Sequence, residues 1–302
     1  MPERAATLDP HEVQAAPPPS GALRNVLRRY PPLVLVAALL ILVVLIVSAA
    51  AEWLAPFHYT TQDLANRLQP PAFLGGLERY PLGTDELGRD ILSRLIYATR
   101  FSVIVAILGT SIGAVVGTLL GFVAAHFRGW IEEALMMLVD AQASVPFMLL
   151  ALAVLAFFGN SLTLFILVLG INGWENYARL TRGMVLSARE QGYAVAVHAL
   201  GATPARIYMR HILPNIAAVL IVQFTLNFPA TILLETSMSF LGLGIQPPLT
   251  SLGQMLGAGR NHLLAAWWIA VLPGTMIFLT TLSVSLFGDW LRDRLDPTLR
   301  GR

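Results

Sequence analysis

The sequence predicts an all-α integral membrane protein with six transmembrane helices. Hydrophobic residues make up 56% of its 302 residues, charged residues only 13%, and the mean hydropathy is +0.66. These values lie far from those of soluble domains and exclude a large soluble helical core. A helix needs about 20 apolar residues to cross the bilayer core. Six runs near that length occur, at residues 33–51, 101–125, 135–158, 162–178, 216–238 and 263–287.

The first apolar run is predicted to be an uncleaved helix, over residues 31–52. The small residues Ala49-Ala50-Ala51 resemble a signal-peptide cleavage site. However, this run has 19 residues rather than about 7–15, and 32 residues precede it. Residues 1–30, which contain Pro17-Pro18-Pro19, are predicted to be a disordered cytoplasmic tail.

The arginine distribution predicts the orientation, because the chain contains no lysine. With the N-terminus inside and six alternating spans, 14 of the 20 arginines fall in inside segments and six in outside segments. Cytoplasmic loops carry an excess of positive charge. We therefore expect both termini, including the tail at residues 291–302, and the loop at residues 187–215 to be cytoplasmic.

The loop at residues 187–215 is longer and more structured than a chain reversal requires. Leu200-Gly201 predicts a helix end with a left-handed cap, and Thr203-Pro204 predicts the start of the next helix. Pro214 is expected to mark re-entry into the membrane. This form is typical of a docking element for a soluble partner.

The segment at residues 53–98 is predicted to be an external loop that ends in an amphipathic interfacial helix. Pro70-Pro71 and Gly75-Gly76 indicate an irregular first part. From Gly88 onward, the apolar residues fall on one helical face. Packing or membrane anchoring is favoured over substrate handling for this helix. The region at residues 99–290 then forms the core of the protein, with the other five spans.

Polar residues inside the spans are functional candidates by default. Asp140 and Asn227 are the candidates for a translocation path, although a structural ion pair explains Asp140 equally well. Glu235 is expected to be structural. The six histidines show no metal-site spacing, and the absence of cysteine excludes disulfides and thiolate metal sites, so no metal site is predicted.

Small residues and prolines predict how the helices pack and bend. Glycine recurs every four residues at positions 109, 113, 117 and 121, and Gly113 and Gly117 are expected to let another helix approach closely. The partner could lie in the same chain or in a second subunit. Pro146 is expected to kink the third span.

Three motifs resemble signatures of one protein family. They are PLGTDELGRDILSRLIYATRFS at residues 81–102, SFLGLGIQPPLTSLGQML at 239–256 and LFGDWLRDRLDPTLR at 286–300. On these motifs the chain resembles the permease subunit of an ABC importer of the dipeptide/oligopeptide/nickel branch, of the DppC/OppC type. The resemblance implies the type I ABC importer permease fold and a bacterial inner-membrane location. It also implies a second homologous permease as heterodimer partner, two ATP-binding subunits, and a periplasmic or lipid-anchored substrate-binding protein.

The resemblance also assigns an ATPase-coupling role to the 187–215 loop. Ala196 and Gly201 match the family's glutamate-alanine-alanine, three residues, glycine pattern, whereas Val195 and Val197 replace its glutamate and second alanine. These substitutions imply a more apolar docking contact. The expected coupling residues are Glu190, Tyr193, Val195, Ala196, Val197, Ala199, Leu200, Gly201 and Ala202.

The expected function is that of a peptide permease subunit rather than an enzyme. A P-loop needs a lysine that this chain lacks, so ATP and Mg²⁺ are expected to be used by the partner ATPases, and the chain itself is expected to bind no cofactor. No nucleic-acid partner is expected. A nickel or other small-solute permease of the same branch is the alternative. An independent secondary carrier or channel is disfavoured, because its spans would hold more ion-coupling charges. A membrane-embedded hydrolase is disfavoured because the spans contain one aspartate, no histidine and no lysine.

Overall fold

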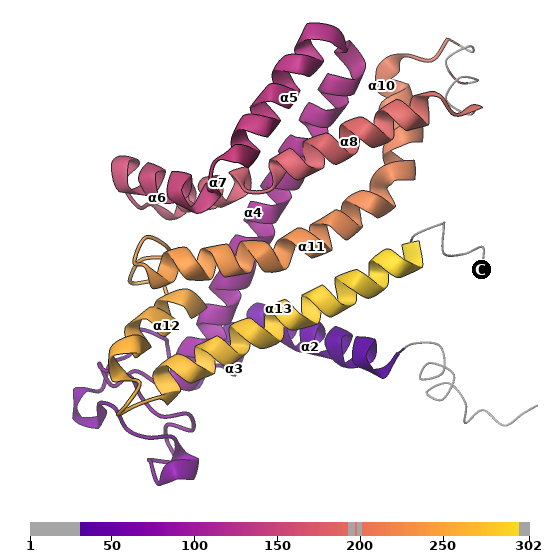
Figure 1. The fold of residues 1–302 in the computed structure, drawn as a ribbon. Helices are drawn as coiled ribbons and strands as arrows, with labels where there is room; N and C mark the ends of the chain where they lie inside the picture. Colours follow the sequence, from indigo (N-terminus) through magenta and orange to yellow (C-terminus); the bar gives the residue numbers. More distant parts are fainter. Residues whose placement is uncertain (1–30, 193–196, 198–200, 296–302) are drawn as a thin grey trace, which may run out of the picture.

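The structure is a computed structural model that describes residues 31–192, 197 and 201–295. Within these residues all regular secondary structure is helical, apart from one isolated bridge between Thr84 and Asp90. The predicted all-α class is therefore confirmed. Figure 1 shows the long helices crossing one another, with the loop at residues 55–90 at the lower left and the turn between α8 and α10 at the upper right.

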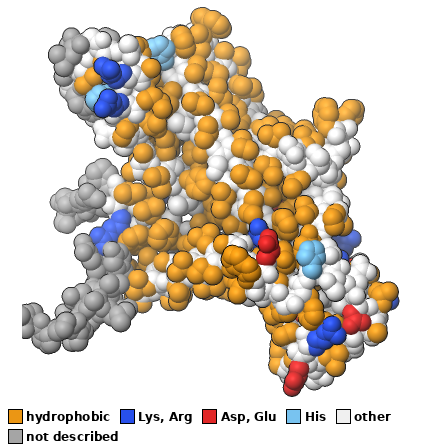
Figure 2. Space-filling view, turned by 180° about the vertical axis from the view of Figure 1, so that it is seen from behind, with side chains coloured by type: hydrophobic (Ala, Val, Ile, Leu, Met, Phe, Trp, Pro, Cys, Tyr) orange, Lys and Arg blue, Asp and Glu red, His pale blue; other side chains and the backbone are white. Residues whose placement is uncertain are grey.

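The first half of the described chain contains a short span, a long loop and the longest helix. Its elements are α2 (Pro32–Ala49), α3 (Ala51–Leu54), η1 (Leu64–Asn66), η2 (Ala72–Leu74) and α4 (Ile91–Phe127). The α2 helix packs against α13 and α4. Many of its leucines, valines and isoleucines stay exposed, as in a helix that faces lipid. Figure 2 shows a face covered mostly by hydrophobic side chains, with most of the visible charged side chains toward its ends.

The separate interfacial helix predicted before residue 98 is not observed. Asp90 caps the N-terminus of α4, because its carboxylate accepts a hydrogen bond from the backbone N–H of Ser93 at 2.7 Å. From Ile91 the helix then runs without a break for 37 residues, to Phe127. The predicted apolar face, including Ile91 and Leu95, packs inside the protein rather than on a membrane surface. The prediction failed because burial by tertiary contacts and burial by lipid give the same sequence pattern.

The predicted third and fourth spans are each divided. Helices α5 (Gly129–Ser144) and α6 (Phe147–Phe158) meet at an angle of 89° beside Pro146. Val145 is extended because the proline ring disfavours helical geometry in the preceding residue. Helices α7 (Leu162–Ile171) and α8 (Trp174–Arg189) are separated at Gly173. Its φ of +83° lies in the left-handed region, which is incompatible with a continuous right-handed helix.

The second half contains α10 (Pro204–Ile207), the π-helical turn η3 (Tyr208–Ile212), α11 (Leu213–Phe240), α12 (Leu252–Gly259), η4 (Arg260–His262) and α13 (Trp268–Leu295). Pro214 lies in the first turn of α11, and α10, η3 and α11 form one helical run from Pro204 to Phe240. The last helix begins at Trp268 rather than at residue 263, since a turn closed on the carbonyl of His262 precedes it.

The described residues therefore contain four helices that are long and apolar enough to cross a membrane, or five if α5 and α6 count as one span. The predicted number of six transmembrane helices is therefore approximate. The fourth predicted span is not among these four or five helices, because α7 with 10 residues and α8 with 16 are each shorter than the roughly 20 residues that cross a bilayer.

The glycines of α4 pack against α7 and α8 of the same chain. A Cβ atom added at Gly113 would lie 3.0 Å from the carbonyl oxygen of Asn172, and one at Gly117 would lie 2.2 Å from that of Trp174. Only glycine allows so close an approach. The helices that pack on these glycines therefore lie in the same chain rather than in a second subunit.

Candidate functional site

The loop between α8 and α11 is held against the end of α4. The side chain of Arg189 donates a hydrogen bond to the carbonyl of Ala125 at 2.9 Å, and His126 is hydrogen-bonded to the hydroxyl of Tyr208 at 2.9 Å. Behind these contacts lies an apolar cluster of Ala125, Val185, Ala188, Ile207, Ile212 and Ile216. The base of the loop is therefore firmly packed, so a force applied to the loop would reach α4, α8 and α11 together.

The described coupling candidates occupy the two ends of this loop. Glu190 caps α8 and is exposed, while Val197 and Ala202 are joined by a backbone hydrogen bond of 3.3 Å. Gly201 has a φ of +80°, and Thr203 accepts a hydrogen bond from the backbone of Arg206, as expected for the start of α10. Tyr193, Val195, Ala196, Ala199 and Leu200 lie outside the described residues.

An open, mostly apolar cavity lies beside this loop. Its volume is about 430 Å³, and it is lined by the last turns of α4 and the start of α10, at Phe122, Val123, His126, Phe127, Thr203, Pro204, Ala205 and Tyr208. It offers an apolar surface next to the expected coupling residues.

Asp140 forms an ion pair within its own chain. Its carboxylate lies 3.0 Å from Arg179 of α8, and a second pair, at 2.5 Å, joins Glu132 of α5 to Arg182 of α8. The Asp140 side chain is nevertheless 72% exposed. Asp140 therefore pairs with α8 and is still accessible from the exposed side of α5.

Asn227 lies in α11 next to the break between α7 and α8. Its side-chain nitrogen is buried without a hydrogen-bond partner. A Cβ atom at Gly173 would come within 2.2 Å of that nitrogen. The Tyr177 side chain of α8 interacts with that of Asn227, so the amide faces a buried hydroxyl of its own chain.

Glu235 is fully buried and connects three helices. Ser239 donates a hydrogen bond to one carboxylate oxygen at 2.7 Å, and Ser102 of α4 donates to the other at 3.0 Å. The hydroxyl of Ser102 in turn accepts a bond from the backbone of Leu252 at the start of α12.

A second pocket, which sequence reasoning missed, lies at the 55–90 end. Two of its lining residues, Arg89 and Arg94, pair with the buried Asp85, which is 1% exposed. The Asp85 carboxylate accepts hydrogen bonds from the backbone of Leu87 and Arg89, from Nε of Arg89 at 2.6 Å and from Nη1 of Arg94. Nη2 of Arg94 reaches the hydroxyl of Thr250 at 3.4 Å. The first two signature motifs therefore meet here, through residues that are 156 positions apart in sequence.

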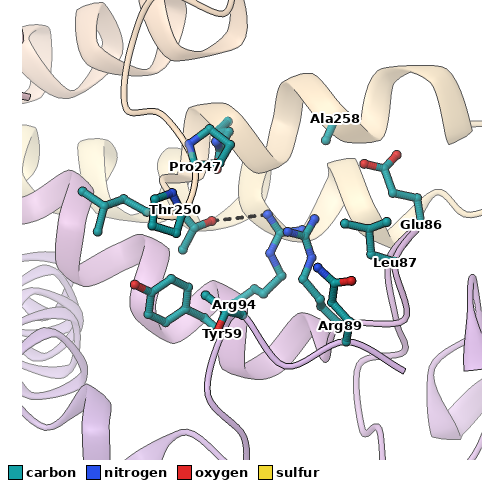
Figure 3. Close-up of a pocket in the computed structure, with 13 residues that line it drawn as sticks. Tyr59, Glu86, Leu87, Arg89, Arg94, Pro247, Thr250 and Ala258 are labelled. Atoms are coloured by element: carbon teal, nitrogen blue, oxygen red, sulfur yellow. Dashed lines mark hydrogen bonds between the residues drawn. The ribbon is translucent and has the colours of Figure 1, made fainter. Parts of the chain in front are cut away.

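The cavity above this cluster has a volume of about 570 Å³. Figure 3 shows the side chains of Arg89 and Arg94 next to each other, facing Thr250 and Pro247, with Glu86 set apart from them. The lining residues are Tyr59, Thr60, Gln62, Glu86, Leu87, Arg89, Arg94, Pro247, Pro248, Leu249, Thr250, Gln254 and Ala258. The charged residues of the first motif were the only indication of this pocket in the sequence. The sequence does not show that Arg94 of this motif contacts Thr250.

The loop around this pocket is an ordered structure. The Asp63 carboxylate accepts hydrogen bonds from Asn66 at 2.9 Å and from the hydroxyl of Tyr80 at 2.8 Å, and these bonds lower the pKa of Asp63 below its usual value. Nε1 of Trp268 donates to the carbonyl of Thr84 at 3.1 Å, which attaches the loop to α13. Trp268 is therefore a buried packing residue rather than the interfacial anchor that its position at the end of a span would indicate.

Comparison with known proteins identifies the family. The family model described as the binding-protein-dependent transport system inner membrane component matches residues 117–301, and the N-terminal transmembrane domain of oligopeptide transport permease C matches residues 29–71. This chain belongs to the binding-protein-dependent transport permeases. The resemblance of the three motifs to DppC/OppC-type permeases is thus confirmed.

Relatives of this permease cover most of its length. It is 39% identical to the di/tripeptide transport system permease DppC of Pseudomonas aeruginosa over 251 residues, which is 83% of each chain. It is 36% identical to the glutathione transport system permease GsiD of Escherichia coli over 254 residues, covering 83% of this chain and 82% of GsiD. The fold is similar to that of a chain in the inward-facing MetNI methionine ABC transporter, with a TM-score of 0.56 and 17% identity, over 68% of this chain and 98% of that one.

These findings settle the broad function. The chain is a membrane permease of the ABC importer type, and its family membership implies ATPase and substrate-binding partners. The α8–α11 loop and the 55–90 loop lie at opposite ends of the helices (Figure 1).

Proposed function

We propose that this permease forms, with a second homologous permease, the path by which di- and oligopeptides cross the bacterial inner membrane. The observation that carries the proposal is its identity of 39% and 37% with permeases named for di/tripeptide and dipeptide transport, each over 83% of this chain. The path would have a mostly apolar lining with few fixed charges. Such a lining suits substrates whose side chains vary.

The energy for transport comes from two separate ATP-binding subunits, which hold the ATP and Mg²⁺, while this chain binds no cofactor and hydrolyses nothing. Residues 190–201 dock on those subunits. The packing of Ile207 and Ile212 against α4 and α8 supports this role, because it would pass a movement of the loop into the helices. Val195 and Val197 make the contact more apolar than the family's glutamate and alanine would.

Both termini and the 187–215 loop face the cytoplasm, and the 55–90 loop faces a periplasmic or lipid-anchored binding protein. The arginine bias supports this orientation. Asp140 and Asn227 lie along the path. The exposure of Asp140 supports its assignment, and Asn227 is assigned from its place beside the break at Gly173, while Glu235, Gly113, Gly117 and Pro146 have structural roles.

Uptake by the purified complex in proteoliposomes tests the substrate. We expect ATP-dependent uptake of labelled dialanine when the permease pair, the ATPases and the binding protein are all present. Nickel uptake without peptide uptake would instead support the small-solute alternative. Peptide uptake by this chain alone, driven by an ion gradient without ATP, would contradict the importer assignment and support a secondary carrier.

A further inference from the structure

The pocket at the 55–90 end has the size and walls of a ligand site. Its volume of about 570 Å³ lies within the range of about 300–1,000 Å³ that is usual for small-molecule pockets. Tyr59, Leu87, Pro247 and Pro248 supply apolar walls, and Gln62 and Gln254 supply polar groups. Pockets with mostly apolar walls and a few polar groups bind and orient small ligands.

Asp85 neutralises only part of the positive charge of Arg89 and Arg94. Arg89 and Arg94 both pair with the single carboxylate of Asp85, which leaves one excess positive charge in the trio. Arg89 is 20% exposed and uses only its Nε in that pair, so its two Nη groups have no partner within the described residues. Arg94 is 4% exposed, and its Nε is buried without an acceptor. An uncompensated guanidinium with free N–H groups favours a carboxylate, which matches its planar geometry.

Glu86 gives the same cavity a negative group. One of its oxygens lies 3.1 Å from Nε2 of His262, and its side chain is 39% exposed. Figure 3 shows it apart from the two arginines. A ligand with a negative group at one end and a positive group at the other would therefore find a partner for each.

We propose that this pocket binds short peptides by their termini, with the C-terminal carboxylate on Arg89, supported by Arg94, and the N-terminal ammonium on Glu86. The inference rests on the proposed function, since it takes peptides as the substrate. Every linear peptide carries these two groups whatever its side chains. A site that reads only the termini therefore accepts many sequences, and the pocket becomes the first peptide contact on this permease.

A thiol placed in the pocket tests this inference. The chain contains no cysteine, so Thr60→Cys gives this subunit a single reactive position, on an exposed residue that lines the cavity. The assembled transporter with both permeases and its ATPases is placed in lipid nanodiscs. The rate of maleimide labelling of this subunit is then measured with increasing dialanine or dialanine amide.

We expect dialanine to slow labelling, and its amide, which lacks the carboxylate, to need about a tenfold higher concentration for the same protection. In the same background, Arg89→Gln should remove the difference between acid and amide, and Arg89→Lys should keep part of it. Arg79→Gln is the matched control, because Arg79 lies in the same loop but packs on Phe57 and Tyr80 and does not line the cavity. It should leave the difference unchanged.

Equal protection by acid and amide in the otherwise unsubstituted protein would overturn the inference, and this comparison does not depend on the folding of any arginine variant. Protection by peptide-free binding protein but not by dialanine would also overturn it, because the pocket would then hold a segment of that partner. A complex that imports dialanine without ever protecting the thiol would refute the pocket and leave the proposed function standing. A complex that imports no peptide would refute the proposed function, and labelling unaffected by dialanine in that complex would refute the pocket as well.

Discussion

The contact between α4 and α8 at Gly117 allows a quantitative prediction. A Cβ atom at this position would lie 2.2 Å from the carbonyl oxygen of Trp174 and 2.7 Å from Cβ of Tyr177. Real Cβ atoms essentially never come closer than 3.0 Å to another heavy atom, so Gly117→Ala forces the two helices apart by at least 0.8 Å at the carbonyl. The carbonyl belongs to the backbone and cannot rotate away, so the strain spreads along α8.

Overpacking of this kind costs about 1–3 kcal/mol. Any glycine-to-alanine change in a helix also stabilises it by about 1 kcal/mol through the better helix propensity of alanine. The control must therefore be a glycine-to-alanine change in a helix as well. Gly183→Ala is that control, because Gly183 lies in α8 with nothing within 4 Å of the added Cβ. We therefore expect Gly117→Ala to be about 1–3 kcal/mol less stable than Gly183→Ala. At about 2–4 °C per kcal/mol for a large domain, its unfolding midpoint should be several degrees lower.

The assay is thermal unfolding of the two purified variants in the same detergent, followed by the loss of the monodisperse peak in size-exclusion chromatography. A larger residue such as leucine at position 117 should disrupt the packing further. If Gly117→Ala were as stable as Gly183→Ala, the close approach of α4 and α8 would be wrong.

Four further predictions address the loop, the two ion-pair sites and the pH response. Gly201→Pro cannot adopt the observed φ of +80°, so it should abolish substrate-stimulated ATPase activity while membrane insertion stays normal; retained stimulation would argue against coupling through this loop. Asp85→Asn leaves two guanidinium groups without their carboxylate and should destabilise the permease by about 3–5 kcal/mol in thermal unfolding, so a neutral effect would exclude the buried cluster. Asp140→Asn breaks an exposed pair and should cost at most about 1 kcal/mol, so a loss of peptide uptake at normal stability would assign Asp140 to the path, whereas normal uptake would remove it. Hydrogen bonds from Asn66 and Tyr80 lower the pKa of Asp63, so its ionised form stabilises the loop at pH values above the ordinary pKa of 3.8, and this stability is lost as the pH falls through the lowered pKa. Asp63→Asn should therefore flatten the acid part of a series of unfolding measurements against pH, and an unchanged series would exclude the effect.

Local chemistry explains which features of the fold could be predicted from sequence. Hydropathy identified the helical membrane class, and the left-handed Gly201 and the cap at Thr203 follow from residue preferences that act within a few positions. The glycine ridge of α4 is likewise visible as a period of four. Its partner is not, because only the folded chain brings Trp174 beside Gly117.

The features that could not be predicted depend on contacts between distant segments. The first turns of α4 carry the pattern of an interfacial helix, yet the 55–90 loop and α12 bury them. Asp85 and Thr250 are 165 positions apart, and no pattern in either motif indicates that Arg94 joins them. The break at Gly173 was missed because hydropathy averages over a window and does not register one residue with positive φ.

The most direct test of the importer assignment is a pull-down of the tagged chain from its native membrane in a gentle detergent, with the partners identified by mass spectrometry. We expect recovery of a second homologous permease together with P-loop ATPase subunits, in a complex that Gly201→Pro weakens. A chain that is recovered alone, stable and monodisperse, would contradict the assignment of this protein as one subunit of an ABC importer.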